Sequence, residues 1–244
     1  ALLGEIAPQL DGSHFVVHVS RGLVDERLNP MSHLIRSLTP VRRIGALAGP
    51  LTASSLRAGE PMAAIVGSDF PEVIDSLRDG FSSTRLRLYG TGDIRGVELA
   101  SSLTGMLLFA LGLARGLNLS AASQGVLATR GLAEITRVGV ALGAKAETFT
   151  GLAGVGDLMA ALAGEIRPEM ETGLAVARGT SPRDALASAA VHVESDVVAL
   201  RVARLADSLR VHTPIATTVA RILGGELEAR DAVEKLMRRR VGTE

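Results

Sequence analysis

Cysteine and tryptophan are both missing from the 244 residues, and aromatic residues make up only 2% of the chain. Without cysteine, disulfide bonds, zinc–thiolate sites, iron–sulfur clusters and cysteine nucleophiles are excluded together. A cysteine-free chain is typical of the reducing cytoplasm, which is the location we expect. The scarcity of aromatic rings removes the platforms on which nucleic-acid bases stack. The core must therefore be built from alanine, leucine and valine.

The chain also lacks net charge and long apolar runs. Lys plus Arg (26) cancels Asp plus Glu (26), so we expect no attraction to nucleic acid or to anionic membranes. The longest apolar stretch, Met106–Ala114, has about nine residues, whereas a membrane span needs about 20. The first residues carry no basic segment ahead of the apolar ones, which argues against a secretory signal. With 47% hydrophobic residues, the chain is predicted to be globular, with one large domain or two small ones.

Short apolar runs bounded by turn residues predict strands in the first 90 residues. These runs are Phe15–Ser20, Ile44–Ala48, Met62–Val66 and Leu86–Tyr89. Helical spacing lies between them at 34–38 and 71–81, the second helix having Pro71 in its first turn after a cap at Ser68 or Asp69. The alternation predicts an α/β layer.

Helical periodicity dominates after Gly96. Apolar residues recur at three- and four-residue intervals from Val97 to Ala114. Further helices are expected at 120–142, from Ser181, and at 193–209, 214–223 and 228–240. The rest of the chain is therefore predicted to be all-helical, with the boundary near Gly90–Gly96.

Two glycine-rich segments each allow two interpretations. Gly90–Gly96 has one residue too many for a phosphate-binding turn, so we favour a hinge between domains. Gly151–Asp157 ends in a carboxylate at a predicted helix start, where Asp157 either caps the helix or faces a ligand. On spacing alone we favour the cap.

The histidines and the C-terminal cations favour structural interpretations. His14 and His18 on one strand would lie about 13 Å apart, at about 3.3 Å per residue, too far to share a metal ion. We therefore predict no metal site. His192–Glu194 is interpreted as the start of a helix rather than as a polar pair. Lys235 and 238–240 complement the dipole of a last helical turn rather than form a binding patch.

Six segments in order resemble one family of proteins. They are Ser20–Leu23, Gly49–Ala53, Gly96–Leu99, Thr129–Glu134, Thr148–Leu158 and Val193–Glu194. Their order and spacing are similar to those of the NAD(P)-dependent glycerol-3-phosphate dehydrogenases. The resemblance implies an incomplete Rossmann-like dinucleotide-binding domain at 1–93 and an all-helical substrate domain at 94–244. It also implies NAD or NADP as cofactor, and hydride transfer between glycerol 3-phosphate, a small phosphorylated substrate, and dihydroxyacetone phosphate.

Several positions depart from the family pattern. Where the family reads Gly-Gly-Ala-Leu-Lys-Asn, this chain has Ala100–Gly105, so Thr104 replaces the lysine that serves as acid or base. A family Ser-Arg-Asn-Arg segment, which holds the phosphate, is replaced by Arg167–Met170, where Glu169 adds a repelling charge. Arg21 replaces a lysine and exchanges a compact ammonium for a planar guanidinium.

Other positions keep the roles that the resemblance implies. Gly49 and Ala53 approach substrate and cofactor through their backbone, Asp157 lies at the substrate, and Glu194 lies near the nicotinamide. Arg21 is the remaining candidate for contacts with both substrate and cofactor. Because an acid or base commonly contributes about 10²- to 10⁴-fold to the rate, we expect little or no ordinary activity.

Three interpretations stay open. The chain is a divergent dehydrogenase that uses another substrate and recruits Arg21 or Arg167, or a non-catalytic binding or regulatory module on the same fold. Alternatively, it is a fragment of a longer chain, because the residues before Phe15 contain no glycine-rich strand–turn–helix. If the chain is complete, its open sheet edge predicts a homodimer.

Overall fold

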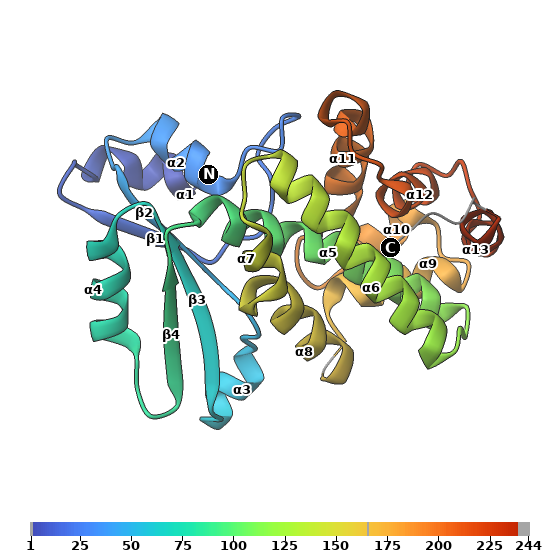
Figure 1. The fold of residues 1–244 in the computed structure, drawn as a ribbon, viewed down its shortest axis with the longest axis horizontal. Helices are drawn as coiled ribbons and strands as arrows, with labels where there is room; N and C mark the ends of the chain where they lie inside the picture. Colours follow the sequence, from blue (N-terminus) through green and yellow to red (C-terminus); the bar gives the residue numbers. More distant parts are fainter. Residues whose placement is uncertain (1, 165, 239–244) are drawn as a thin grey trace. The chain divides into compact units, whose positions relative to one another are not determined.

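The computed structural model describes residues 2–164 and 166–238. The chain forms two compact units, Ala1–Thr104 with Ile135–Gly164 and Gly105–Glu134 with Glu165–Glu244, called the first and second units below. Two long helices, α5 (Ile94–Gly116) and α6 (Ala121–Ala141), each run from one unit into the other. Figure 1 shows the elements in chain order.

The first unit contains a four-stranded mixed sheet in the order β1-β2-β3-β4. Its strands are β1 (Phe15–His18), β2 (Arg43–Ala48), β3 (Met62–Ser68) and β4 (Leu86–Thr91). β1 pairs parallel with β2 and β3 pairs parallel with β4, whereas β2 and β3 are antiparallel. All four strands that the sequence predicts are present.

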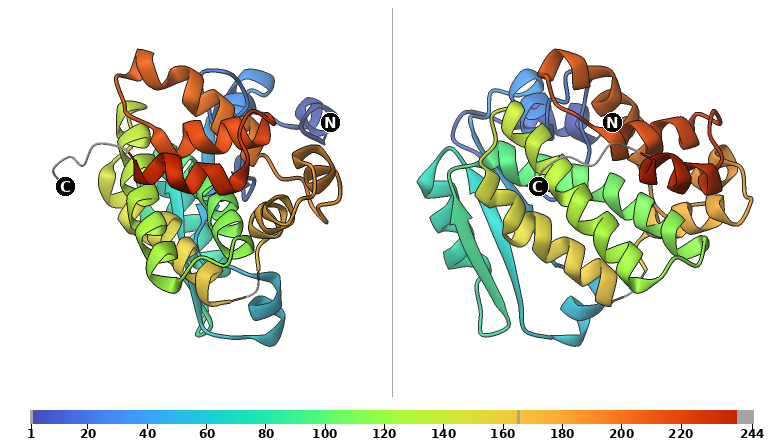
Figure 2. Two further views of the ribbon diagram at one scale, coloured as in Figure 1. Left: turned by 90° about the vertical axis from the view of Figure 1, so that its right-hand side faces the viewer. Right: turned by 45° about the vertical axis from the view of Figure 1, so that its right-hand side comes forward.

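Helices complete the first unit. They are α1 (Leu2–Ile6), the 3₁₀ turn η1 (Ala7–Gln9), α2 (Met31–Leu38), α3 (Ala53–Ala58), α4 (Pro71–Phe81), α7 (Ala146–Thr150), the π turn η2 (Leu152–Gly156) and α8 (Asp157–Ala163). Helix α4 lies against β3 and β4 (Figure 2).

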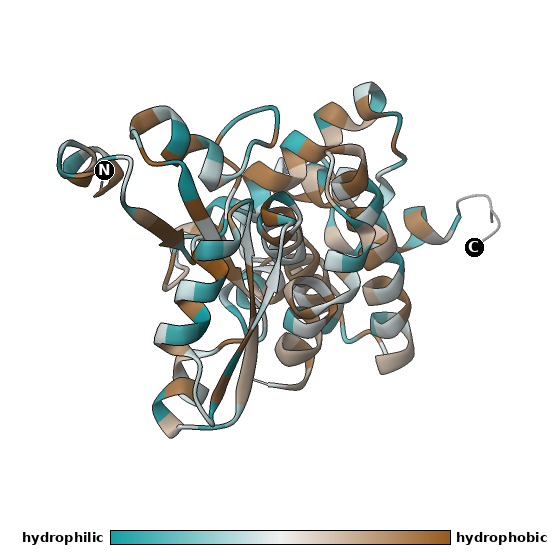
Figure 3. Cartoon of the chain, turned by 60° about the vertical axis from the view of Figure 1, so that its left-hand side comes forward, coloured by the Kyte–Doolittle hydropathy of each residue, from teal (hydrophilic) through white to brown (hydrophobic). Residues whose placement is uncertain are grey.

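The core under α4 follows the two-residue period of the strands. Ala64, Val66 and Leu88 lie on one sheet face and pack with Ile74 of α4. Hydrophobic and hydrophilic residues both occur along α4 in Figure 3, as expected for a helix with one buried face. Burial of this apolar surface fixes the register of β3 and β4.

The predicted cap of α4 is wrong. Its N-cap residue is Phe70, and no side chain among the described residues caps the helix. The Ser68 hydroxyl instead donates to the Ile44 carbonyl (2.7 Å) and accepts from the Phe70 amide (3.2 Å). Because β2 lies beside β3, the Ser68 hydroxyl bonds to the backbone of the neighbouring strand instead of capping α4.

The second unit is all-helical. Beyond its parts of α5 and α6 it contains α9 (Pro168–Ala177), α10 (Pro182–Ala187), α11 (Ser195–Leu209), α12 (Pro214–Leu223) and α13 (Ala229–Met237). Ser181 caps α10 as expected, by accepting from the Asp184 amide. The helix expected at 228–240 corresponds to α13, and residues 239 and 240 of the expected range lie outside the described residues. The α/β-plus-helical fold class is confirmed.

Buried Glu134 joins α6 to the start of α12. Its carboxylate accepts the amide hydrogens of Ile215 (2.9 Å) and Ala216 (2.8 Å), which have no partner inside α12. A negative charge at this end of a helix also complements the helix dipole. Glu134 therefore fixes where α12 begins.

Helix α5 is long and apolar enough to cross a membrane, with a mean hydropathy of 1.7 in its most apolar window. Every residue of that window is buried inside the structure. A helix that is apolar on all sides and enclosed by protein is typical of a protein core. The periodicity between Val97 and Ala114 predicted this helix, but Ser101, Ser102 and Thr104 interrupt its apolar run, so the unbroken run is only about nine residues long.

Candidate functional site

An ion pair joins two of the predicted site residues in the first unit. Arg21 Nη2 lies 2.7 Å from Asp157 Oδ2. The Asp157 side chain is only 1% exposed and that of Arg21 is 29% exposed. Water therefore reaches the guanidinium, whereas the carboxylate is enclosed. This pair forms the centre of the candidate site.

The prediction that Asp157 caps a helix is wrong. Helix α8 begins at Asp157, its N-cap residue is Gly156, and no side chain among the described residues caps it. The carboxylate bonds to Arg21 instead, which is 136 positions away in the chain. Spacing along the chain cannot show such a partner.

The π turn before α8 places Asp157. Gly154 packs so closely that a Cβ atom there would lie 2.0 Å from the Phe149 carbonyl oxygen. Gly49 has a φ of +128°, and its Cβ position is 3.6 Å from the Leu152 backbone oxygen. The loop after β2 therefore packs on the π turn. Glycine is required at 154 by the close contact and favoured at 49 by the positive φ.

Thr104 is fully buried on α5, and its hydroxyl has no hydrogen-bond partner among the described residues. Ala53 is the first residue of α3, where the Thr52 side chain accepts from the Ser55 amide. The roles of Thr104, Ala53 and Gly49 towards substrate or cofactor stay predictions.

The segment Gly90–Gly96 is a strand end, a short turn and a helix start. The Asp93 carboxylate accepts from the Gly96 amide (2.9 Å), the Lys145 amide (2.9 Å) and the Thr148 hydroxyl (2.6 Å). A carboxylate thus occupies the helix N-terminus that a phosphate would need. The phosphate interpretation, disfavoured by the spacing, is excluded by these bonds.

A dinucleotide needs a glycine-rich strand-to-helix turn for its pyrophosphate. In the part of the chain that the structure describes, the turn before α5 is the nearest match, and Asp93 fills it. These residues do not fit a pyrophosphate.

Glu194 belongs to the second unit, where it is the N-cap residue of α11. The interpretation of His192–Glu194 as a helix start is confirmed, although His192 Nε2 also lies 3.3 Å from Glu194 Oε1. The other carboxylate oxygen, Oε2, is buried with no hydrogen-bond partner within 2–164 and 166–238. Its predicted role at the nicotinamide stays a prediction.

Two histidines of the first unit, His14 and His18, pair with carboxylates. His14 Nδ1 lies 2.8 Å from Asp11, and His18 Nε2 lies 2.9 Å from Glu98. No group of three metal-ligating side chains occurs among the described residues.

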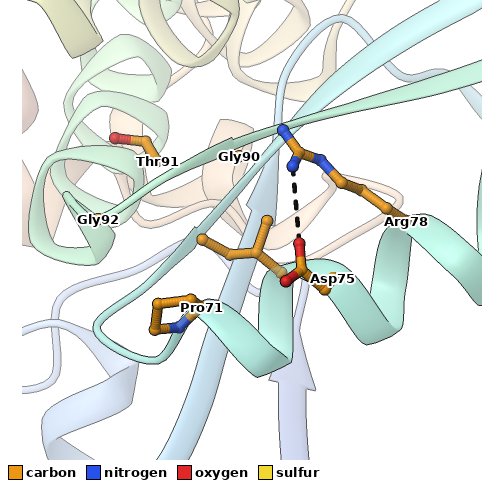
Figure 4. Close-up of a pocket in the computed structure, with 7 residues that line it drawn as sticks. Pro71, Asp75, Arg78, Gly90, Thr91 and Gly92 are labelled. Atoms are coloured by element: carbon orange, nitrogen blue, oxygen red, sulfur yellow. Dashed lines mark ion pairs between the residues drawn. The ribbon is translucent and has the colours of Figure 1, made fainter.

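An open cavity of about 180 Å³ lies between α4 and the end of β4 (Figure 4). Arg78 and Asp75 form an ion pair of 3.8 Å at its wall, and Gly90 and Gly92 line the opposite side. None of the predicted site residues lines it. Sequence reasoning missed this cavity because it depends on packing between elements.

Comparisons with known proteins agree with this architecture. The family model for the "NAD-dependent glycerol-3-phosphate dehydrogenase C-terminus" matches residues 93–234. The glycerol-3-phosphate dehydrogenase [NAD(P)+] of Polaromonas naphthalenivorans is 40% identical over 215 residues, which cover 88% of this chain and 61% of that protein. The corresponding protein of Syntrophotalea carbinolica is 33% identical over 100% of this chain and 74% of its own length.

A solved structure shows the same fold. The crystal structure of glycerol-3-phosphate dehydrogenase from Coxiella burnetii matches with a TM-score of 0.90 and 28% identity, over 98% of this chain and 73% of that chain. The α/β unit, the helical unit and these matches define a two-domain NAD-dependent dehydrogenase fold. The chain belongs to the glycerol-3-phosphate dehydrogenase family. It spans about three fifths of the length of the Polaromonas relative.

Proposed function

We propose that this chain keeps the family fold without the ordinary interconversion of glycerol 3-phosphate and dihydroxyacetone phosphate. The observation that carries the proposal is Thr104, which the resemblance aligns with the acid/base lysine. Its hydroxyl is fully buried, and no group among the described residues bonds to it. An aliphatic hydroxyl is too weak an acid and too weak a base to replace a lysine as proton donor or acceptor near neutral pH.

The Arg21–Asp157 pair supports the same proposal. In the family pattern a lysine stands at position 21, whereas here a guanidinium holds the Asp157 carboxylate at 2.7 Å. Arginine forms planar, charge-assisted bonds with carboxylates that a lysine does not reproduce. A ligand that needs either charge must compete with this pair.

The second unit offers a carboxylate near the position of the family asparagine. A Cβ atom added at Gly105 would lie 3.5 Å from Glu169 Oε1. A carboxylate repels a phosphate ester bound next to it. Glu169 therefore supports a loss of phosphate binding.

Other parts of the proposal rest on the resemblance and on the names of the relatives. We propose NAD or NADP as the cofactor of the complete protein, a small phosphorylated substrate if the site is used, and a cytoplasmic location. The domain limits 1–93 and 94–244, the homodimer, and the ligand roles of Arg21, Gly49, Ala53 and Glu194 are proposals of the same kind.

A second candidate is a dehydrogenase that acts on a different substrate. The buried Asp157 beside a partly exposed Arg21 favours it, because a cation and a carboxylate still meet at the centre of the site. A substrate with both an anionic and a hydrogen-bond-donating group would match this pair.

Restoring the family residues tests the proposal. Thr104→Lys with Gly105→Asn is introduced into the longest polypeptide that the gene encodes, and NADH or NADPH loss is followed with dihydroxyacetone phosphate. The matched control is Thr104→Met with Gly105→Asn, which adds a long side chain without an amine. We expect no turnover in the parent or the control and a gain of about 10²-fold or more over the parent background in the lysine variant.

The outcomes separate the candidates. A gain specific to lysine shows a site that lacks only its acid/base. A folded but inert lysine variant supports a non-catalytic module. Turnover by the parent protein in the usual enzymatic range contradicts the proposal.

A further inference from the structure

The loop that carries Arg21, residues 19–30 between β1 and α2, is attached at both ends to one carboxylate. Glu98 Oε1 lies 2.9 Å from His18 Nε2 at the end of β1. The same oxygen accepts from the Ser32 amide (2.7 Å), and Glu98 Oε2 accepts from the Ser32 hydroxyl (2.6 Å) in the first turn of α2. The Glu98 side chain is only 2% exposed. One buried group therefore fixes where this loop leaves the sheet and where it ends.

The middle of the loop is attached one helical turn further along α5. The Gly22 amide donates to the Ser102 hydroxyl at 3.0 Å. Glu98 and Ser102 are four residues apart, so they share one face of the helix. Gly22 has a φ of +116°, which a side chain would strain. The residue next to Arg21 is thus held by both a hydrogen bond and its backbone conformation.

The loop has internal order that carries these attachments to Arg21. Leu23 and Pro30 form a β-bridge, and the Val24 amide donates to the Asn29 carbonyl at 2.7 Å. Leu28 is fully buried. Because the loop is closed by its own hydrogen bonds and attached at three points, the Arg21 backbone has few alternative conformations.

We infer that Glu98 and Ser102 are positioning residues that orient Arg21 towards Asp157. Neither is among the residues that the family resemblance assigned to substrate or cofactor. Arg21 carries a long side chain whose ordering has an entropic cost, so a fixed backbone favours its short bond to a buried carboxylate. The inference rests on the proposed function only in that it concerns the same site.

A double-mutant cycle tests the orientation directly. Arg21→Met and Asp157→Asn, alone and together, give the coupling between the two side chains from urea unfolding equilibria. The cycle is measured in the parent, in Ser102→Ala and in Ser101→Ala. Ser101 is the matched control, because it is a buried α5 serine with no hydrogen bond to the loop among the described residues.

We expect a coupling of about tenfold or more in the unfolding constant for the parent, and a fall to about threefold or less in Ser102→Ala. Ser101→Ala leaves the coupling unchanged, and Ser102→Thr, which keeps the hydroxyl, restores it. A purely structural Ser102 would lower stability without changing the coupling. An unchanged coupling in Ser102→Ala therefore overturns the inference for Ser102.

Glu98→Gln provides a second, independent test. Glutamine keeps the size and one acceptor oxygen but loses the charge that strengthens the bonds to Ser32 and His18. We expect an intermediate loss of Arg21–Asp157 coupling, and an undiminished coupling contradicts the role of Glu98. All measurements are made without substrate or cofactor, so their failure leaves the proposed function standing, and the turnover assay does not affect them.

Discussion

The two partners of the central ion pair differ in exposure, so their removal should differ in cost. Arg21→Met leaves the Asp157 carboxylate, 1% exposed, without its guanidinium. Asp157→Asn leaves a guanidinium that is 29% exposed and still faces an amide oxygen. Removing one partner of a buried pair costs about 3–5 kcal/mol, whereas a hydrated cation beside a neutral acceptor costs about 1–2 kcal/mol.

Thermal and urea unfolding measure this asymmetry. At about 2–4 °C per kcal/mol for a chain of this size, Arg21→Met should lower Tm by about 6–20 °C. Asp157→Asn should lower Tm by about 2–8 °C on the same scale. The double variant should lose less than the sum of the two, because it no longer contains the charged carboxylate that lost its guanidinium. Equal losses, or a larger loss in Asp157→Asn, would refute the reasoning from burial.

Four further changes have defined outcomes. Gly112→Ala should cost about 3 kcal/mol, because its Cβ would lie 2.1 Å from a backbone oxygen of α9. Gly125→Ala, with nothing within 4 Å among the described residues, should stabilise by about 0.5–1 kcal/mol; urea unfolding of both checks the contrast, and equal effects would contradict it. Thr104→Val should raise stability by about 1 kcal/mol, because it removes a buried hydroxyl without a partner within the described ranges; a loss in calorimetry would show a hidden bond. Partial burial raises the pKa of Asp25, but hydrogen bonds from Asn29 and the Arg27 amide lower the pKa more, to below its ordinary 3.8. The Asp25 carboxylate therefore stabilises the fold above its ordinary pKa of 3.8, and the stability gap to Asp25→Asn should close as the pH falls below that value; a gap that does not change with pH would count against this.

Periodicity predicted most of the elements. The strands were found because apolar runs of strand length stand between turn residues, and the sheet buries them. Helix α12 matches its expected range of 214–223 because Pro214 fits a first turn and one face is apolar. The antiparallel pairing of β2 with β3 was not predicted, because strand direction depends on how the connections run in space.

The candidate site was only partly accessible from the sequence. The family resemblance identified Arg21 and Asp157 separately, but their bond joins positions 136 residues apart. The sequence did not predict the roles of Glu98 and Ser102, although Glu98 lies within the family-like segment Gly96–Leu99. One carboxylate that bonds to two ends of a loop produces no periodic pattern in the sequence. Likewise, Asp93 looked like part of a glycine-rich turn until its three hydrogen bonds were known.

The most direct test of the account is the turnover of the longest polypeptide that the gene encodes, with NADH or NADPH and dihydroxyacetone phosphate. Folding is confirmed in the same sample by a cooperative thermal transition. The account predicts no loss of reduced cofactor above the rate without protein, because the buried Thr104 stands where the resemblance places the acid/base lysine. Turnover in the usual enzymatic range, about 1–10³ per second, would contradict it and require another acid/base, with Arg21 and Asp157 the first residues to substitute.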